Sequence, residues 1–482
     1  MARRWHRSLG IAAVCGALLP AAGGLLYAAT RTAPCDRTEL TASIGDHTAA
    51  APPGSSLDRL TIVLAGDTGF NSTDAKVDAN GMRKGKQTIS FTDALSGVAE
   101  DFDGDLAFAN LETVITDRND IAPETKGKGT FHFRSHPAAV KAMIDIGFNL
   151  FSLANNHSFD YGAAGVEESL YHLAVANAER AIAYAGIGSN FAEAVKPGCI
   201  DLDGTRIALS AIGIITGDQS QYRAGPNRAG QASYRDRPDF EAVVDKLVAM
   251  PADYRVLSIH YGLEGRVEPD ERQLKDWRGV AAEEKGIDLI VGHHPHVAQG
   301  VELNGKSLIF YGLGNFLHPG TTEMKRFGIC RDYGLIAKVH LARASGAWQV
   351  KAIEAIPLTE TQFKPERFSA EEGTKRIYAL NHLAAGLDDE KTAKGVRFTP
   401  QADGTGLYCA DGAAELGGKL ATLCQGWQEP GEPDQALAKK IAAACEDKPF
   451  YGKPAMVKRR VPQQRRRPAA PQPFPFGGPF SR

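Results

Sequence analysis

The sequence lacks the glycine-rich signatures of the common nucleotide-binding folds. Neither a Walker loop nor a Rossmann glycine pattern follows a strand-like run, and residues 81–86 have the wrong spacing for a phosphate-binding loop. The chain also lacks an excess of one charge, because 55 Lys and Arg balance 57 Asp and Glu, for a formal net charge of −2. These absences argue against P-loop and dinucleotide-dependent enzymes, and we expect no nucleic-acid partner.

The N-terminus is typical of an export signal. Basic residues at 3, 4 and 7 precede an uncharged apolar segment that extends to residue 29. Residues 1–29 therefore predict a signal peptide or an uncleaved signal anchor, which places the protein in the periplasm or on a membrane, facing away from the cytoplasm. Residues 30–57 are rich in Ala, Thr, Ser and Pro and predict a linker.

Cysteine is scarce, with seven residues in 482, and the sequence has no CxxC pair that would indicate a cysteine zinc site. An even number of cysteines in the body of an exported chain favours disulfides. We expect a bridge among the last three, since their region has few strand-like runs. The six cysteines after Cys15 are Cys35, Cys199, Cys330, Cys409, Cys424 and Cys445.

Strand-like and helix-like runs alternate between residues 58 and 357, which predicts an α/β domain with parallel or mixed sheets covered by helices. The last two strands are joined by a short Gly-containing link and predict a hairpin, and Ser135 is the expected cap of the first helix. The expected strands are 60–65, 105–110, 149–153, 182–185, 206–212, 255–260, 287–291, 307–311, 335–341 and 348–356, and the expected helices are 137–146, 165–178, 238–250 and 272–285.

The C-terminal third has a different composition. Residues 358–450 have helix-like runs at 370–385 and 434–446 between Gly-rich polar stretches, and predict a small helical or irregular extension. Residues 451–482 are basic and rich in proline, which predicts a disordered tail. This tail and the N-terminal segment are candidates for membrane or acidic-polymer association, and an inert solvated tail fits equally well.

Polar side chains follow several expected strands at the point where each strand ends. Ligands bind at the carboxyl ends of strands in open α/β sheets, so we expect these side chains to form one metal site. Carboxylate and imidazole groups are common ligands of zinc, iron and manganese. The candidate metal ligands are Asp67, Glu112, Asn156, His260, His294 and His296.

The histidines suggest separate roles. Alternate residues on an extended backbone point to the same side, so His294 and His296 should reach one site together while His293 points away. His157 can donate a proton to a leaving group, and Asp160 either orients this histidine or caps the next helix. A single such residue is usually a turn, cap or satisfied polar group, but that explanation does not suit the whole set.

Six runs of this sequence resemble the signature blocks of the CapA family, the capsule and poly-γ-glutamate synthesis branch of the calcineurin-like metallophosphoesterases. The resemblance extends from about residue 60 to 318. It implies a β-sandwich flanked by helices in four layers (αββα), and two divalent ions that share an acidic ligand. The runs are Gly66-Asp67, Asn110-Leu111-Glu112, Ala154 to Gly162, Ser258 to Gly262, Gly292 to Val297 and Gly312 to Phe316.

The resemblance also implies roles for single residues. Asp67 is the shared or first-metal ligand, His157 is the acid, and Arg134 faces the site and stabilises charge. The chain departs from the superfamily pattern twice. The usual Asp-x-His becomes Asp67-Thr68-Gly69, so one imidazole is missing, and the second aspartate block carries Glu112 instead.

Together these features predict an exported hydrolase that uses two divalent ions (Mn, Fe or Zn) and acts on a phosphoester or an anionic envelope polymer. A polymer-binding or export-assisting component without catalysis, or an inactive scaffold, could use the same fold and metal site.

Overall fold

The computed structural model describes residues 32–34, 57–124, 131–215, 220–281, 286–389 and 393–446. The predicted signal segment and basic tail lie outside these ranges, as does most of the predicted linker. Within the linker, strand β1 (Thr32–Pro34) pairs with a strand of the second sheet. Among the described residues, none of the helices is long and apolar enough to cross a membrane.

The first large sheet has ten strands in the order β23-β24-β20-β19-β2-β5-β8-β9, with β18 beside β2 and β21 beside β20. Its β2-β5-β8-β9 half is parallel, while β19 and β20 form the predicted antiparallel hairpin. The strands are β2 (Arg59–Thr68), β5 (Leu106–Leu111), β8 (Leu150–Ser152), β9 (Ala183–Ala185), β18 (Asn315–Leu317), β19 (Gly334–Ala344), β20 (Ala347–Thr359), β21 (Glu366–Arg367), β23 (Thr399–Pro400) and β24 (Gly406–Cys409).

The second large sheet has eight strands in the order β1-β11-β12-β14-β15-β17-β16-β22, and its centre, β12-β14-β15-β17, is parallel. Its other strands are β11 (Gly198–Leu202), β12 (Thr205–Gly213), β14 (Tyr254–His260), β15 (Leu289–His293), β16 (Val301–Asn304), β17 (Ser307–Phe310) and β22 (Ala393–Gly395). Three short pairs complete the strands: β3 (Met82–Lys84) with β4 (Gln87–Ile89), β6 (Val114–Ile115) with β7 (Arg134–Ser135), and β10 (Ile187–Gly188) with β13 (Gly230–Gln231).

The two sheets pack face to face, and alternation along β2 shows how. Ile62 and Leu64 point into the core between the sheets, where they meet residues such as Val256 of β14. Val63 and Ala65 point the other way, into a second core under the helices. Because both faces of the strand are buried, its sequence is continuously apolar instead of alternating.

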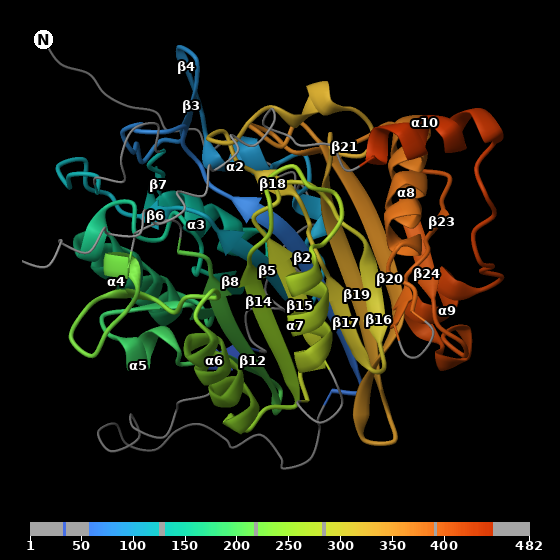
Figure 1. Ribbon diagram of the computed structural model, residues 1–482, viewed down its shortest axis with the longest axis horizontal. Coiled ribbons are helices and arrows are strands. Elements are labelled where there is room, and N and C mark those ends of the chain that lie inside the picture. Colours follow the sequence, from blue (N-terminus) through green and yellow to red (C-terminus); the bar gives the residue numbers. More distant parts are fainter. Residues whose placement is uncertain are drawn as a thin grey trace, which may run out of the picture. The chain divides into compact units, whose positions relative to one another are not determined.

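Helices cover the outer face of each sheet, so the predicted four-layer αββα arrangement is confirmed (Figure 1). The first sheet is covered by α2 (Phe91–Leu95), α3 (Pro137–Asp145) and α4 (Gly162–Glu179). The second is covered by α5 (Phe191–Ala194), α6 (Arg237–Ala249) and α7 (Glu271–Ala281). The predicted cap of α3 was wrong by one residue, because His136 accepts the Ala138 N–H while Ser135 accepts the N–H of Phe70.

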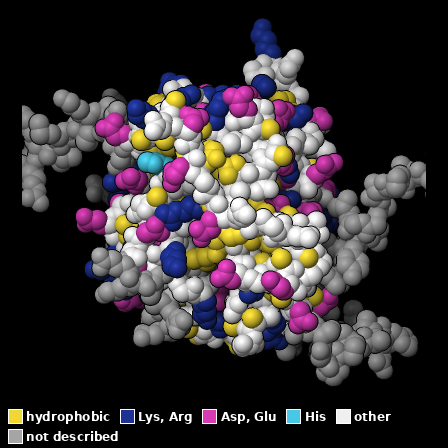
Figure 2. All heavy atoms as spheres, turned by 90° about the vertical axis from the view of Figure 1, so that its right-hand side faces the viewer, with side chains coloured by type: hydrophobic (Ala, Val, Ile, Leu, Met, Phe, Trp, Pro, Cys, Tyr) yellow, Lys and Arg dark blue, Asp and Glu magenta, His cyan; other side chains and the backbone are white. Residues whose placement is uncertain are grey.

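The C-terminal part, expected as a small helical or irregular extension, also adds strands to both sheets. Strand β22 joins the edge of the second sheet, whereas β23 and β24 join the edge of the first. Helices α8 (Ala370–Ala385), α9 (Gly418–Cys424) and α10 (Gln435–Cys445) belong to the same compact unit. On the face that carries them, charged side chains of both signs are interspersed with apolar ones (Figure 2). The added strands are two to four residues long, too short for a periodic signal.

Two cysteine pairs in which both members are described lie at bonding distance. The Sγ atoms of Cys409 and Cys424 are 1.95 Å apart, and the Sγ atoms of Cys330 and Cys445 are 2.01 Å apart. The second pair joins residues 115 positions apart in the sequence and ties the end of α10 to the segment between β18 and β19.

Loss of the long-range pair should destabilise the protein more than loss of the local pair. In the chain-entropy model, removal of a disulfide that closes a loop of roughly 100 residues lowers the free energy of unfolding by about 4–5 kcal/mol. Removal of one that closes a 15-residue loop lowers it by about 3 kcal/mol. Denaturant titration of the oxidised wild type, the Cys330→Ser/Cys445→Ser variant and the Cys409→Ser/Cys424→Ser variant measures both differences. The reverse order of stability would contradict the pairing.

Candidate metal centre

Strands β2 and β5 place two carboxylates at one end of the first sheet. Asp67 and Asn110 are paired in the parallel register of these strands, and the Asn110 Nδ2 donates to Asp67 Oδ1 at 2.8 Å. Glu112 follows β5 directly and is fully buried. Gly66 permits this arrangement, because a Cβ there would lie 1.9 Å from the carbonyl oxygen of Gly314, which accepts the N–H of Asp67.

The second sheet contributes histidines from the matching ends of β14 and β15. His260 ends β14, and His294 and His296 lie in the turn after β15. Both turn residues have positive φ, 95° for His294 and 58° for His296. The expectation of an extended H-x-H pair was therefore wrong. Such backbone geometry is costly for a residue other than glycine and is concentrated at functional sites.

Two groups of possible ligands share Glu112. The first contains Glu112, His260 and His294, and the second contains Asp67, Glu112 and His296, with the ligand atoms of each group within 4.8 Å of one another. Glu112 Oε1 lies 3.5 Å from His260 Nε2, while Glu112 Oε2 lies 3.8 Å from His296 Nδ1. Its two oxygens thus face different groups, and Glu112 takes the shared position that the resemblance offered to Asp67.

Asn156 belongs beside the first group. Its Oδ1 lies 2.6 Å from His260 Nε2, so the amide oxygen and the imidazole nitrogen point to the same place. The neighbouring Asn155 holds this loop by accepting the N–H of His157 and donating to the backbone oxygen of Leu111. The structure therefore brings all six predicted ligands together.

His157 and Asp160 form a pair at the edge of the centre. His157 Nδ1 lies 2.8 Å from Asp160 Oδ2, which also accepts the N–H of Phe133 at 2.6 Å. The other ring nitrogen, Nε2, lies 3.9 Å from Glu112 Oε1. Of the two roles left open for Asp160, the structure selects orientation of His157, because α4 begins after Tyr161 without a side-chain cap.

Burial and charge shift the pKa values within the centre. Burial lowers the pKa of His294 to about 4 and that of His260 well below its usual value, so both rings are neutral at neutral pH. Burial raises the pKa of Glu112 well above its usual value. Burial lowers the pKa of His296 too, but the Glu112 and Asp67 carboxylates outweigh it and raise this pKa to about 10. Ligation of a cation here would therefore release protons.

The donor set fits divalent metal ions. Within the described part of the chain, both carboxylate oxygens of Glu112 and the Nδ1 of His294 are buried without a hydrogen-bond partner. Leaving such groups unsatisfied costs free energy, and a cation in each ligand group would satisfy them. Mixed imidazole and carboxylate donors suit transition metals such as Mn, Fe and Zn.

Arg134 contacts the backbone of two neighbouring loops. Its guanidinium donates to the backbone oxygens of Ala75 and Arg118 and lies over the ring of Tyr161, with 4.9 Å from Cζ to the ring centroid. These contacts hold the loops around β7 in place. The role of Arg134 in stabilising charge at the reacting group stays a prediction.

Three residues of the centre were not predicted from the sequence. His293 was expected to point away, yet its Nδ1 lies 3.2 Å from Asp67 Oδ1. Asn315 accepts at Oδ1 from the His296 ring, with 2.9 Å between Oδ1 and Nδ1, and its only signal was the run Gly314-Asn315-Phe316. His318 is fully buried with Nε2 3.8 Å from Glu112 Oε2, and no pattern in the sequence indicated it.

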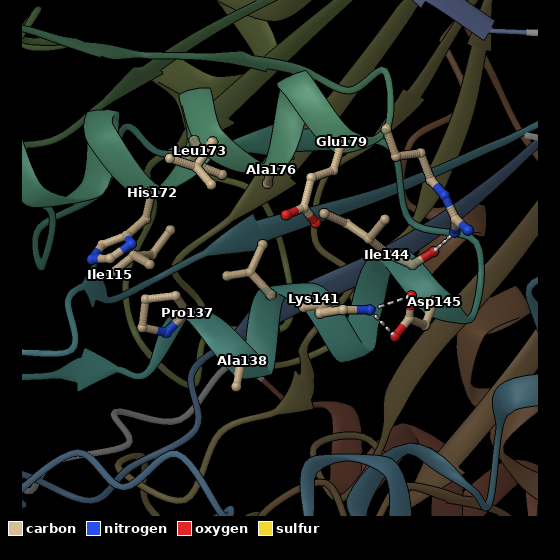
Figure 3. A pocket seen from close by; sticks show the side chains of 13 residues that line it. Ile115, Pro137, Ala138, Lys141, Ile144, Asp145, His172, Leu173, Ala176 and Glu179 are labelled. Carbon is tan, nitrogen blue, oxygen red and sulfur yellow. Dashed lines mark hydrogen bonds and ion pairs between the residues drawn. The ribbon is translucent and has the colours of Figure 1, made fainter.

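A surface cluster of similar composition lies elsewhere. Asp117, Glu168 and His172 group beside the groove between α3 and α4, where the Lys141 Nζ donates to Asp145 and His172 lines one end (Figure 3). These residues are half-buried or exposed, and exposed acidic groups often cluster without a metal. The cluster provides control positions for experiments on the buried centre.

Comparison with known proteins places the chain in a family. Residues 61–319, more than half of the chain, match the family model described as bacterial capsule synthesis protein PGA_cap. The chain belongs to this family, as the resemblance of its signature runs predicted.

Curated relatives agree with this assignment. The PGA biosynthesis protein CapA of Bacillus subtilis is 27% identical over 290 residues, 60% of this chain and 71% of the relative. The capsule biosynthesis protein CapA of Bacillus anthracis is 30% identical over 258 residues, 52% of this chain and 58% of the relative. The chain thus spans less than two thirds of the second protein.

Solved structures that align with this chain include the calcineurin-like phosphoesterase YfkN from Bacillus subtilis, at 15% identity with a TM-score of 0.34. That alignment covers 67% of this chain and 97% of the other. A hypothetical protein from Thermus thermophilus aligns at 14% identity with a TM-score of 0.33, over 62% of this chain and 98% of that protein.

Proposed function

We propose that this protein is an exported, metal-dependent hydrolase of the metallophosphoesterase type that acts in the synthesis of capsule, poly-γ-glutamate or another envelope polymer. Its substrate would be a phosphoester or an anionic envelope polymer. Membrane association would come from the N-terminal segment or the basic tail. Two of the relatives are named for PGA or capsule biosynthesis, which supports the choice of polymer class.

One observation supports hydrolysis above all. Two buried ligand groups share Glu112, and the His157–Asp160 pair lies beside the same carboxylate, with 3.9 Å between His157 Nε2 and Glu112 Oε1. A structural cation site needs ligands but has no use for an oriented, partly accessible imidazole at its edge. The pair therefore favours catalysis over a binding role for the same fold.

Different residues of this chain would hold the two cations. Glu112, Asp67 and His296 would hold one cation, and Glu112, His260 and His294, with Asn156, the other. Bound in this way, two divalent ions supply an activated water and neutralise charge on a phosphoryl or acyl centre.

His157 would act as the acid. Asp160 accepts from Nδ1 and fixes the ring, which leaves Nε2 facing the centre, where it can deliver a proton to the leaving oxygen or nitrogen. Imidazole is suited to this role because its ordinary pKa lies near neutrality.

A substrate panel tests the proposal. The full chain, stripped of metal, is assayed with a phosphodiester, a phosphomonoester and a γ-glutamyl amide, each with added Mn²⁺ and with EDTA. We expect turnover of at least one class only with metal, and the class identifies the bond that is cleaved. Tight binding of cations without turnover of any of the three classes would favour the non-catalytic polymer-binding component.

A further inference from the structure

The ligand group around Asp67 lacks the imidazole that the Asp-x-His pattern of the superfamily would supply. The residue two positions after Asp67 is Gly69, which has no side chain to offer. Asp67, Glu112 and His296 are the members that the ligand geometry brings together. A histidine from another part of the chain lies at the position that Gly69 leaves open.

That histidine is His318, and strand pairing fixes its place. Strand β18 runs parallel to β2 with Asn315 opposite Asp67 and Leu317 opposite Thr68, so the next residue after β18 arrives beside Gly69. The N–H of Gly69 donates to the Leu317 oxygen at 2.8 Å. The N–H of His318 donates to the Thr361 oxygen at 2.7 Å, which holds its backbone from the other side.

The ring of His318 fills the space of a side chain at position 69. A Cβ on Gly69 would lie 3.1 Å from His318 Nε2 and 3.3 Å from Cε1. A side chain at 69 would therefore require this ring to shift. The glycine is explained by the space that the ring takes and not by its backbone, because φ at Gly69 is outside the left-handed region.

The ring is also aimed at the shared carboxylate. His318 is fully buried, its Nε2 lies 3.8 Å from Glu112 Oε2, and its ring is packed edge-on against Phe133 and His296. In the region that the structure describes, neither ring nitrogen makes a hydrogen bond to another side chain. The 3.8 Å between His318 Nε2 and Glu112 Oε2 is longer than the roughly 3–3.5 Å expected for two ligand atoms that each lie about 2.0–2.2 Å from one cation, so binding would draw these two atoms together.

We propose that His318 is the missing imidazole ligand of the Asp67–Glu112–His296 cation site, supplied from β18 in place of a side chain at position 69. The site then takes a borderline transition ion, such as Mn²⁺, Fe²⁺ or Zn²⁺, in preference to Mg²⁺ or Ca²⁺, which favour all-oxygen donors. The inference rests on the metal centre of the proposed function but not on hydrolysis.

A ligand swap tests it. His318→Ala should lose one of two bound Mn²⁺ ions, and Gly69→His alone should also lose it because the two rings collide. Gly69→His combined with His318→Ala should restore the second ion. Loss of an outer-shell partner costs about 10–100-fold in metal affinity, and loss of a direct ligand should cost more. Exposed His382 in α8 gives the control His382→Ala.

The readouts do not involve turnover. Elemental analysis counts Mn²⁺ per chain, and electron paramagnetic resonance distinguishes a coupled ion pair from a single ion. Circular dichroism checks folding, and His318→Asn keeps the shape of the side chain if the alanine variant unfolds. Two ions bound with wild-type affinity in His318→Ala and His318→Asn would overturn the proposal.

Other outcomes are also decisive. Wild-type protein that binds at most one ion, with no change in His318→Ala, would equally overturn the proposal. A third outcome separates the two proposals. If the wild type binds two ions but turns over no substrate of the panel, and His318→Ala loses one ion, the hydrolase proposal is wrong and this inference holds.

Discussion

Replacement of Glu112 by Gln is expected to remove both bound cations together. Glu112 is common to the two ligand groups, and its two oxygens face different groups at 3.5 and 3.8 Å. The amide keeps the shape of the side chain but lacks the charge that a bridging ligand needs. Outer-shell losses weaken metal binding by about 10–100-fold, so each ion should lose more than that, and turnover should disappear with them.

Metal content and Mn²⁺ affinity are measured for Glu112→Gln and for two further variants. Asp67→Asn should weaken mainly the ion held with His296, and His294→Ala mainly the ion held with His260, because each belongs to one group. Glu168→Gln, in the surface cluster, is the matched control and should leave both ions bound.

Thermal unfolding of the metal-free proteins tests whether Glu112→Gln loses its cations because the variant is unstable. Glu112 is fully buried and burial raises its pKa, so without a cation its carboxyl group is costly. Metal-free Glu112→Gln should therefore unfold at or above the temperature of the metal-free wild type. A variant that keeps one ion at wild-type affinity would show that Glu112 is not shared.

The strands that position the site were predictable because they are buried on both faces. A strand such as β14 reads as one apolar run that stops at His260, and the parallel pairing of such strands brings their ends to one edge. Helix α8 was placed at residues 370–385, the bounds that it has in the structure. Long periodic or continuously apolar runs thus gave the fold class and most of the ligands.

The remainder depends on contacts that no local pattern encodes. The positive φ of His294 and His296 is imposed by the turn, and it also brings the His294 N–H to 3.2 Å from Asp67 Oδ2. His318 reaches the site through the pairing of β18 with β2, about 250 residues earlier in the chain. The hydrogen bonds of Arg134 to Ala75 and Arg118 were not predictable either, because these partners come from loops whose course the sequence does not show.

Replacement of His157 by Ala is expected to abolish most turnover while both cations stay bound. General acid catalysis contributes about 10²–10⁴-fold, and the Nε2 of His157 lies 3.9 Å from Glu112 Oε1, at the edge of the centre. The loss should depend on the leaving group. A p-nitrophenolate leaving group departs without a proton, so turnover of a p-nitrophenyl ester should fall little. Turnover of an alkyl ester should show the full loss.

Asp160→Asn refines the same test. The amide can no longer balance the positive charge of an imidazolium at His157 Nδ1, so we expect an intermediate loss of turnover. His172→Ala, on α4 outside the centre, is the control. Undiminished turnover of alkyl esters in His157→Ala would remove its role as the acid. Loss of metal in that variant would make His157 a ligand instead, because a group that only delivers a proton can be deleted without disturbing the cations beside it.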